Sequence, residues 1–293
     1  MTTDRTDALV STAWLADHLD APDIRIVDAT YYLPTENKNA RQLFEEAHIP
    51  GAVFFDIDEI SNTGRDLPHM VPPPEKFSAK ARKLGLGDGS RIVVYDQKGI
   101  VSAPRVWWMF RLFGHQDVAV LDGGLPKWRR EERPVEDGPA RGPGERHFTA
   151  RTNNALLRER DQVWRAITTG RAQVVDARTA ERFRGEAAEP RAGLRNGHIP
   201  ASVNVPFDSL IDPQDGTLKD EAAISEAFRQ AAVDPKRPVI TTCGSGVTAC
   251  VLALALRTIG AKDVAVYDGS WAEWGASAET PVETGPANVE TTS

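Results

Sequence analysis

The chain contains very little cysteine, since Cys243 and Cys250 are the only two among its 293 residues. Seven positions along a loop and a helix would separate the two thiols by about 10 Å, which is too far for a disulfide. A chain without disulfides is typical of a cytosolic protein. Because Cys250 falls within an apolar segment, we interpret it as a small core residue, and Cys243 becomes the candidate reactive thiol.

Long apolar runs and an excess of positive charge are also missing. No stretch is long enough to span a membrane, and the first residues, Met1 to Arg5, do not form a signal peptide. The net charge of −7 gives no reason to expect nucleic acid or anionic membrane as a partner. No histidine or cysteine cluster has metal-ligand spacing, so we expect no metal. These features predict a cytoplasmic protein.

The chain repeats itself at an interval of 146 to 150 residues, which indicates two copies of one domain. The matching segments are Val27-Asp28-Ala29 with Val175-Asp176-Ala177, Ala47-His48-Ile49-Pro50 with Gly197-His198-Ile199-Pro200, and Asp117-Val118-Ala119-Val120 with Asp263-Val264-Ala265-Val266. We place the first domain at 8–134 and the second at 155–285. Residues 135–154 are rich in proline, glycine and charge, and we interpret them as a linker.

Short apolar strands alternate with helix-length segments in both halves. This alternation predicts an α/β fold in which each half is a mostly parallel sheet flanked by helices. The expected strands are Ile24–Val27, Ile92–Tyr95, Gln173–Val175, Val203–Val205 and Val239–Ile240, and the expected helices are Phe77–Leu84, Ala103–Phe113, Ala222–Ala232 and Thr248–Ile259.

The segment that begins at Cys243 carries the strongest functional signal. It joins an apolar strand to an apolar helix, and Gly244 and Gly246 allow close backbone approach. Backbone N–H groups at a helix start favour an anion, so a thiolate should form readily at Cys243. Aligning the two halves places Asp96 where the second half has Cys243, so we expect one site per chain.

These residues resemble the rhodanese superfamily of sulfurtransferases. The loop Cys243-Gly244-Ser245-Gly246-Val247-Thr248-Ala249 is similar to that of the 3-mercaptopyruvate sulfurtransferases, and the segments Ser102–Trp108 and Asp268–Trp271 also match the superfamily. The resemblance extends from about Val10 to Trp274. It implies tandem rhodanese-like domains with the site in a cleft between them. Because Asp96 stands where the second half has Cys243, we expect the first domain to be non-catalytic.

The resemblance also implies roles for individual residues. Arg182 and Arg191 match the pair that holds the substrate's carboxylate and keto oxygen, a task for which guanidinium groups are suited. Arg184 is a rival for either role. The loop residues Gly244, Gly246, Val247 and Thr248 are expected to contact the substrate.

A proton relay is implied as well. Asp58, His69 and Ser245 match a proposed chain of carboxylate, imidazole and hydroxyl that would deliver a proton near the reacting sulfur. His48 and His198 stand at equivalent repeat positions, and we interpret them as structural.

The implied reaction moves sulfur from 3-mercaptopyruvate to Cys243 as a covalent persulfide, and then to a thiol, cyanide or thioredoxin, with pyruvate released and no other cofactor. Three alternatives remain open. A thiosulfate sulfurtransferase shares the fold, but its loop usually carries basic residues. A phosphatase or arsenate reductase would need arginine where Ala249 stands. A non-catalytic persulfide carrier would release nothing without its protein partner.

Overall fold

A computed structural model describes residues 8–140, 142 and 144–287 of the chain, so that Met1 to Arg5 lie outside the described residues. Contacts divide the chain into two compact units. The first takes in the chain up to Thr63, Val71–Asn153 and Ile211–Leu218. The second takes in Gly64–Met70, Asn154–Leu210 and the chain from Lys219 onward.

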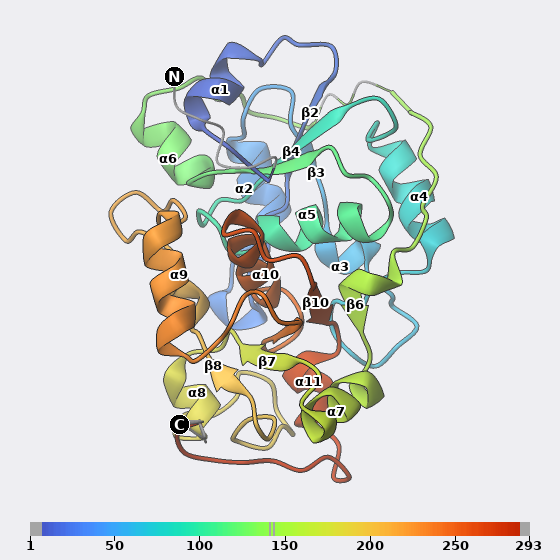
Figure 1. The fold of residues 1–293 in the computed structure, drawn as a ribbon. Coiled ribbons are helices and arrows are strands. Elements are labelled where there is room, and N and C mark those ends of the chain that lie inside the picture. Colours follow the sequence, from blue (N-terminus) through green and yellow to red (C-terminus); the bar gives the residue numbers. More distant parts are fainter. Residues whose placement is uncertain (1–7, 141, 143, 288–293) are drawn as a thin grey trace. The chain divides into compact units, whose positions relative to one another are not determined.

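The first unit is a five-stranded sheet with helices on both faces (Figure 1). Its strands are β1 (Leu9–Val10), β2 (Ile24–Asp28), β3 (Val53–Phe54), β4 (Arg91–Tyr95) and β5 (Val118–Leu121). Its helices are α1 (Thr12–Asp17), the 3-10 turn η1 (Pro34–Glu36), α2 (Ala40–Glu46), α3 (Ile57–Ile60), α4 (Pro74–Lys83), α5 (Ala103–Leu112) and α6 (Gly124–Arg130).

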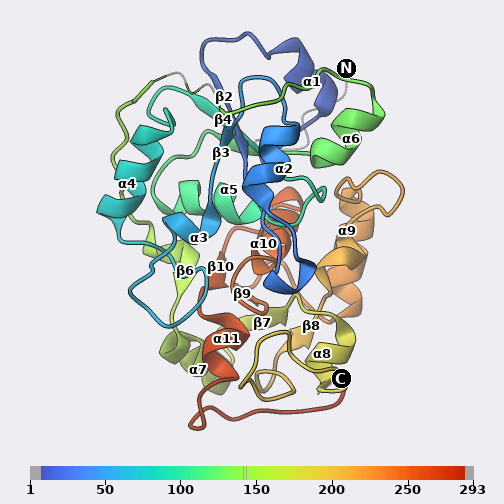
Figure 2. The same ribbon diagram turned by 180° about the vertical axis from the view of Figure 1, so that it is seen from behind.

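The second unit repeats this plan (Figure 2). Its strands are β6 (Leu157–Arg158), β7 (Gln173–Asp176), β8 (Val203–Asn204), β9 (Val239–Thr242) and β10 (Val264–Tyr267). Its helices are the 3-10 turn η2 (Asn154–Leu156), α7 (Arg160–Thr169), α8 (Ala180–Arg184), the 3-10 turn η3 (Phe207–Leu210), α9 (Glu221–Gln230), α10 (Ala249–Thr258) and α11 (Ser270–Trp274).

The two sheets have the same topology. The strand orders are β1-β5-β4-β2-β3 and β6-β10-β9-β7-β8, and the strands pair in parallel throughout. The α/β class with a mostly parallel sheet in each half is therefore confirmed. Because β9 is central and β7 lies beside it, the residues that follow Thr242 and Asp176 emerge next to each other at the carboxyl edge of the second sheet.

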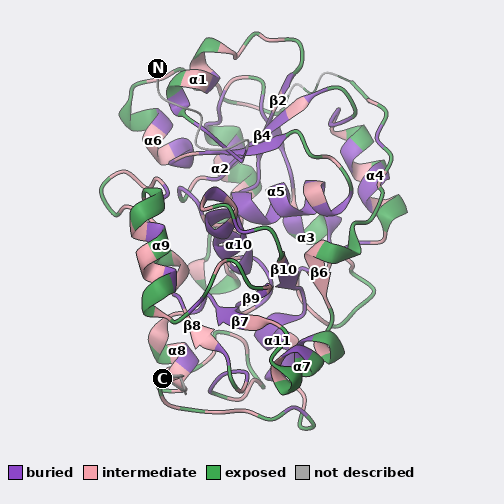
Figure 3. Cartoon of the chain, in the orientation of Figure 1, coloured by how far each residue is buried: buried purple, intermediate pink, exposed green. Residues whose placement is uncertain are grey.

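The second sheet is covered on both faces. On one face α7 and α11 enclose a core that includes Val163, Val174, Ile240 and Trp274. On the other, α10 packs over β9 and β10. Every residue of α10 except Arg257 is buried (Figure 3), as its apolar sequence predicts. The helix therefore fixes the position of the loop that precedes it.

The unit boundaries differ from the contiguous domains expected from the sequence. Residues Gly64–Met70 group with the second unit and Ile211–Leu218 with the first. The expected linker is also partly built into the first unit, since Glu136 forms a backbone bridge with His48 and Phe148 is buried among aromatic rings. Glu283 makes the same bridge to His198, so the repeat continues past residue 134.

Within the described ranges, no helix has both the length and the hydropathy of a membrane span.

Candidate active site

Cys243 directly follows the central strand β9 of the second sheet. Its side chain is nearly buried, at 2% exposure, and five residues separate it from the start of α10 at Ala249. Gly246 has a φ of +78°, a left-handed conformation that favours glycine and lets the loop turn tightly. Cys250 lies in the first turn of α10, where its thiol donates a hydrogen bond to the Gly246 carbonyl at 3.3 Å. Both cysteines are free thiols.

The start of α11 anchors the loop at Cys243. The Cys243 carbonyl accepts the Trp271 N–H at 2.9 Å, and the Gly244 carbonyl accepts the Ala272 N–H at 2.8 Å. The Cys243 N–H donates to Ser270 Oγ at 3.2 Å, so this group is used structurally and does not face a ligand. These bonds hold the first residues of the loop in place.

The rest of the loop presents unused donors. The N–H groups of Gly244, Ser245, Val247 and Thr248 donate to no acceptor within the described part of the chain. Ser245 and Val247 are buried, so water does not easily replace the missing acceptors. Such a group of amides before a helix favours an anion, which here would be the sulfur carried by Cys243.

The first unit shows what an equivalent loop does with its donors. Asp96 follows β4 just as Cys243 follows β9, and its carboxylate is fully buried. Asp96 Oδ2 accepts the N–H groups of Val101, Ser102 and Ala103 at 2.8–2.9 Å, and Oδ1 accepts that of Lys98 at 2.9 Å. In the first unit, therefore, the loop already holds an anion of its own.

Arg182 and Arg191 converge on the residue next to the thiol. A Cβ atom added to Gly244 would lie 3.1 Å from Nη2 of Arg182 and 3.9 Å from Nη1 of Arg191. Arg182 comes from α8, and Arg191 from the loop that follows it. No side chain between Cys243 and Ala249 carries a charge, so the two guanidinium groups supply the positive charge at the loop.

Buried acids hold one of these arginines. Nη2 of Arg182 lies 2.5 Å from Oε2 of Glu189, whose side chain is 2% exposed. Glu189 also pairs with Arg178 at 2.7 Å, and Arg178 pairs with Asp176 at the end of β7. Burial alone would lower the pKa of Arg178, but the carboxylates of Asp176 and Glu189 outweigh it and raise that pKa. Arg191 has no acidic partner among the described residues.

Arg184, the rival candidate, points to a different environment. Its guanidinium makes two hydrogen bonds to Glu186, whose side chain is 56% exposed. The structure therefore brings Arg182 and Arg191, and not Arg184, to Gly244.

His69 lies at the loop although it comes from the first half of the sequence. Its Nδ1 is 2.9 Å from Oγ of Ser245, and the ring is 4% exposed. The backbone of His69 has a φ of +60°, which is uncommon for a residue with a side chain. Such a conformation persists only where surrounding contacts determine it, so the ring is held in place.

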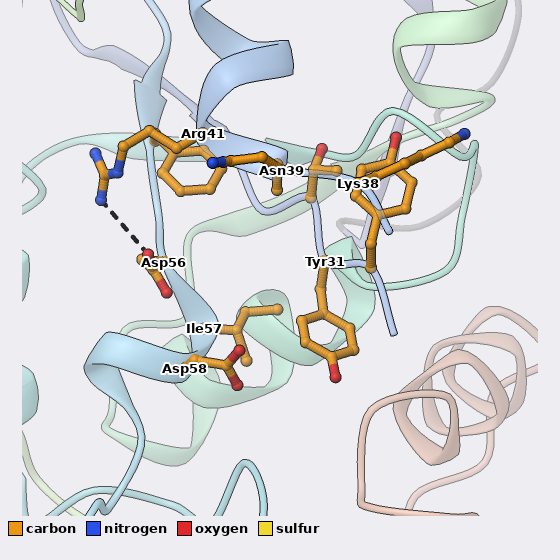
Figure 4. Close-up of a pocket in the computed structure, with 11 residues that line it drawn as sticks. Tyr31, Lys38, Asn39, Arg41, Asp56, Ile57 and Asp58 are labelled. Carbon is orange, nitrogen blue, oxygen red and sulfur yellow. Dashed lines mark hydrogen bonds and ion pairs between the residues drawn. The ribbon is translucent and has the colours of Figure 1, made fainter. Parts of the chain in front are cut away.

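Asp58, the expected third member of the relay, lies in the first unit. It is an exposed residue in the first turn of α3 and lines a cavity of about 450 Å³ together with Tyr31 and Lys38 (Figure 4). Arg41 and Asp56 also line this cavity, and they pair at 3.5 Å (Figure 4). The role of Asp58 in the relay stays a prediction.

The match to a family model decides the classification. A model described as "Rhodanese-like domain" matches residues 11–131 and 159–277. The chain belongs to the rhodanese family. The superfamily resemblance inferred from the Cys243 loop is therefore confirmed.

Individual rhodanese relatives cover almost the whole chain. It is 44% identical to human "3-mercaptopyruvate sulfurtransferase" over 273 residues, with 91% of each chain covered. It is 43% identical to rat "Thiosulfate sulfurtransferase" over 274 residues, again with 91% of each covered. The solved structure of SseA from Escherichia coli, described as a 3-mercaptopyruvate sulfotransferase with the rhodanese fold, is 41% identical, with a TM-score of 0.83 and coverage of 91% and 99%.

Two histidines of the rhodanese repeat are built into the fold, as expected. His48 stacks on Phe44 with ring centroids 4.0 Å apart, and His198 stacks on Phe183 at 3.8 Å. In each case Nδ1 is bonded to the carbonyl of the stacked phenylalanine. Burial lowers the pKa of His198, which suits a neutral packing residue.

Reasoning from the sequence missed Arg178, Glu189 and Ser270. Arg178 had a local signal, because it stands two positions after Asp176, where an apolar strand gives way to charge. Ser270 lies in the segment Asp268–Trp271 that matches the superfamily, but that match gave it no role. Glu189 had no signal, since an acid in a polar loop is ordinary. Their importance follows only from the partners that the fold provides.

Proposed function

We propose that this chain is a 3-mercaptopyruvate sulfurtransferase that works through a persulfide on Cys243. The observation that carries the proposal is the convergence of Arg182 and Arg191 on Gly244, next to the thiol of an otherwise uncharged loop. Two guanidinium groups match the carboxylate and keto oxygen of an α-keto acid, and this places its thiol sulfur near Cys243. Uncharged neighbours suit a donor with one negative charge.

The first half-reaction breaks the carbon–sulfur bond of the donor. The Cys243 thiolate attacks the sulfur of 3-mercaptopyruvate, a sulfur–sulfur bond forms, and the electron pair of the broken bond leaves with the carbon as the enolate of pyruvate. The arginines stabilise the enolate oxygen and the carboxylate. The outer sulfur first carries the thiol proton of the donor and loses it to solvent, and the N–H groups of Gly244, Ser245, Val247 and Thr248 then stabilise the resulting persulfide anion on Cys243.

The enolate must take up a proton to become pyruvate. Ser245 stands two residues after Cys243 in the loop, and Nδ1 of His69 lies 2.9 Å from its hydroxyl oxygen. A proton can pass from the imidazole through the hydroxyl to the enolate carbon, and solvent then restores the imidazole proton. Asp58 is the proposed orienting carboxylate of this path.

The second half-reaction returns the enzyme to its thiol form. A nucleophile attacks the outer sulfur of the persulfide, and Cys243 leaves as thiolate. With a thiol acceptor the product is a new persulfide, and with cyanide it is thiocyanate. We propose a small thiol or reduced thioredoxin as the natural acceptor.

A steady-state comparison of donors tests the proposal. With cyanide as acceptor, 3-mercaptopyruvate should give the higher kcat/KM and thiosulfate the lower. Equal or better turnover with thiosulfate would contradict the donor assignment. It would instead favour a thiosulfate sulfurtransferase, as the rat relative is named. One persulfide per chain with no turnover on any small acceptor would instead indicate a carrier.

A further inference from the structure

Glu189 bridges two arginines at the edge of the active-site loop. Its Oε2 lies 2.5 Å from Nη2 of Arg182, and its Oε1 lies 2.7 Å from Nη1 of Arg178 and 3.3 Å from Nε of Arg182. A carboxylate so buried accepts from both guanidinium groups and leaves neither oxygen for water. Its position therefore determines where the Arg182 guanidinium lies.

The far end of the bridge is rigid. Arg178 is fully buried, donates from Nε and Nη2 to the carboxylate of Asp176, and also donates to the carbonyl of Gly197 at 2.8 Å. Its guanidinium carbon lies 4.3 Å from the ring centroid of Trp271, next to the residues that anchor Cys243. Glu189 is thus paired with a buried guanidinium that several bonds hold in place, and Arg182 is paired with Glu189.

The bridge also sets the charge beside the thiol. The linked carboxylates are those of Asp176 and Glu189, and the guanidinium groups are those of Arg178, Arg182 and Arg191. Among these five side chains one positive charge is left over, and Arg191, which has no acidic partner in the described ranges, carries it; the thiolate of Cys243 adds the same negative charge whichever donor binds. One surplus charge matches a monoanion such as 3-mercaptopyruvate, whereas a dianion such as thiosulfate would bring one negative charge too many.

We propose that Glu189 is a specificity-determining residue: it fixes the Arg182 guanidinium at Gly244 and limits the surplus positive charge to one, so that the site prefers monoanionic over dianionic sulfur donors. The inference rests on the proposed function. Glu189 touches no reacting atom and acts through Arg182 as a positioning residue. Loss of the Glu189 carboxylate would free the Arg182 guanidinium and raise the surplus positive charge from one to two. Both changes would favour thiosulfate over 3-mercaptopyruvate as donor.

The kinetic test compares Glu189→Gln with Glu186→Gln. The control removes the acid of the exposed Arg184–Glu186 pair, which has the same chemistry but does not reach the loop. In Glu189→Gln the ratio of kcat/KM for thiosulfate to that for 3-mercaptopyruvate should rise by at least about tenfold, the effect of about one added charge at close range. Glu189→Asp keeps the charge and should stay within about threefold of the parent. The ratio should not change in the control.

A binding measurement separates this inference from the proposed function. Alkylation of Cys243 by neutral iodoacetamide is followed by peptide mass, with sulfate as a dianionic and pyruvate as a monoanionic protecting ligand. The ratio of their apparent Kd values should shift toward sulfate by about tenfold in Glu189→Gln, whichever donor the parent enzyme prefers. A folded Glu189→Gln enzyme whose donor ratio and protection ratio both match the parent would overturn the inference. If Glu189→Gln fails to fold, Glu189→Asp and Arg182→Lys give a second comparison. The inference is supported if the thiosulfate-to-3-mercaptopyruvate ratio of kcat/KM rises in Arg182→Lys and stays at the parental value in Glu189→Asp. Parental ratios in both variants would overturn it.

Discussion

Nδ1 of His69 lies 2.9 Å from Oγ of Ser245, although 176 positions of sequence separate the two residues. The contact forms within the second unit, because Gly64–Met70 groups with the unit that holds the Cys243 loop and not with the rest of the first half. A segment from the first half of the sequence, the half that we predict to lack the reactive thiol, therefore supplies a side chain to the loop that bears Cys243. Because His69 contacts Ser245 directly, substitution of His69 alone tests the proposed proton path.

His69→Asn should lower kcat while leaving the fold intact. Asparagine tolerates the left-handed backbone at this position and can still bond to Ser245, but its amide does not transfer protons. We expect kcat to fall by about 10²–10⁴-fold, the range for a lost acid or base. Steady-state kinetics across pH give the measurement, and His48→Asn, at a packed position, is the control that should affect thermal stability and not kcat. An unchanged kcat and pH profile in His69→Asn would remove the relay.

Arg191→Ala should weaken the use of 3-mercaptopyruvate without unfolding the protein. Arg191 has no acidic partner in the described part of the chain, so its removal leaves no buried charge unpaired. The expected loss in kcat/KM is about 2–4 kcal/mol, that of a charge-assisted contact at the reacting group. Arg184→Ala, which removes the arginine of an exposed pair, is the matched variant and should remain within about twofold of the parent in the same assay. Equal losses in both variants would contradict the assignment of Arg191.

The sequence predicted those features that depend on neighbours along the chain. Apolar runs and glycines located β9, the Cys243 loop and α10 to within two residues. The pattern ended β9 at Ile240 because Thr241 and Thr242 are polar, yet both are buried in the sheet. The pairing of Glu189 with Arg178 and Arg182 joins an irregular loop to residues before and within α8, and that of His69 with Ser245 joins distant positions. Neither pairing leaves a periodic pattern in the sequence. Only the fold could reveal the contacts of Glu189, whereas the family resemblance also pointed to His69 and Ser245.

Asp28→Asn should stabilise the first unit at neutral pH. Asp28 is fully buried, and burial raises its pKa to about 6 against the opposing hydrogen bonds from Thr30 and Gln97. Because the folded pKa lies above the unfolded value of 3.8, ionisation costs stability, and the free energy of unfolding falls as pH rises from about 4 to 6. Asparagine avoids this cost, which is at most about 3 kcal/mol at pH 7.

Thermal unfolding at pH 4 and pH 7 measures this effect. The gain in Tm of Asp28→Asn should be present at pH 7 and nearly absent at pH 4. The repeat offers a matched variant, Asp176→Asn, which leaves Arg178 without its main partner and should destabilise at both pH values. A gain that is equal at both pH values would show that ionisation of Asp28 is not its cause.

Asp96→Ala should create a vacant anion site in the first unit. The variant loses the acceptor for the N–H groups of Val101, Ser102 and Ala103, at a cost of about 3 kcal/mol or more. A small carboxylate should bind in its place and restore stability according to its concentration. Acetate titrations followed by Tm give the measurement, with the parent protein as reference. The same acetate dependence in both proteins would show that the loop does not act as an anion site.

Peptide mass spectrometry after one equivalent of 3-mercaptopyruvate, without acceptor, tests the central claim most directly. The account predicts one added sulfur on Cys243, none on Cys250, and one pyruvate released per chain. Cys243→Ser should release no pyruvate, and Cys250→Ser should retain the full burst. Pyruvate release without a persulfide on Cys243, or a persulfide on Cys250 alone, would contradict it.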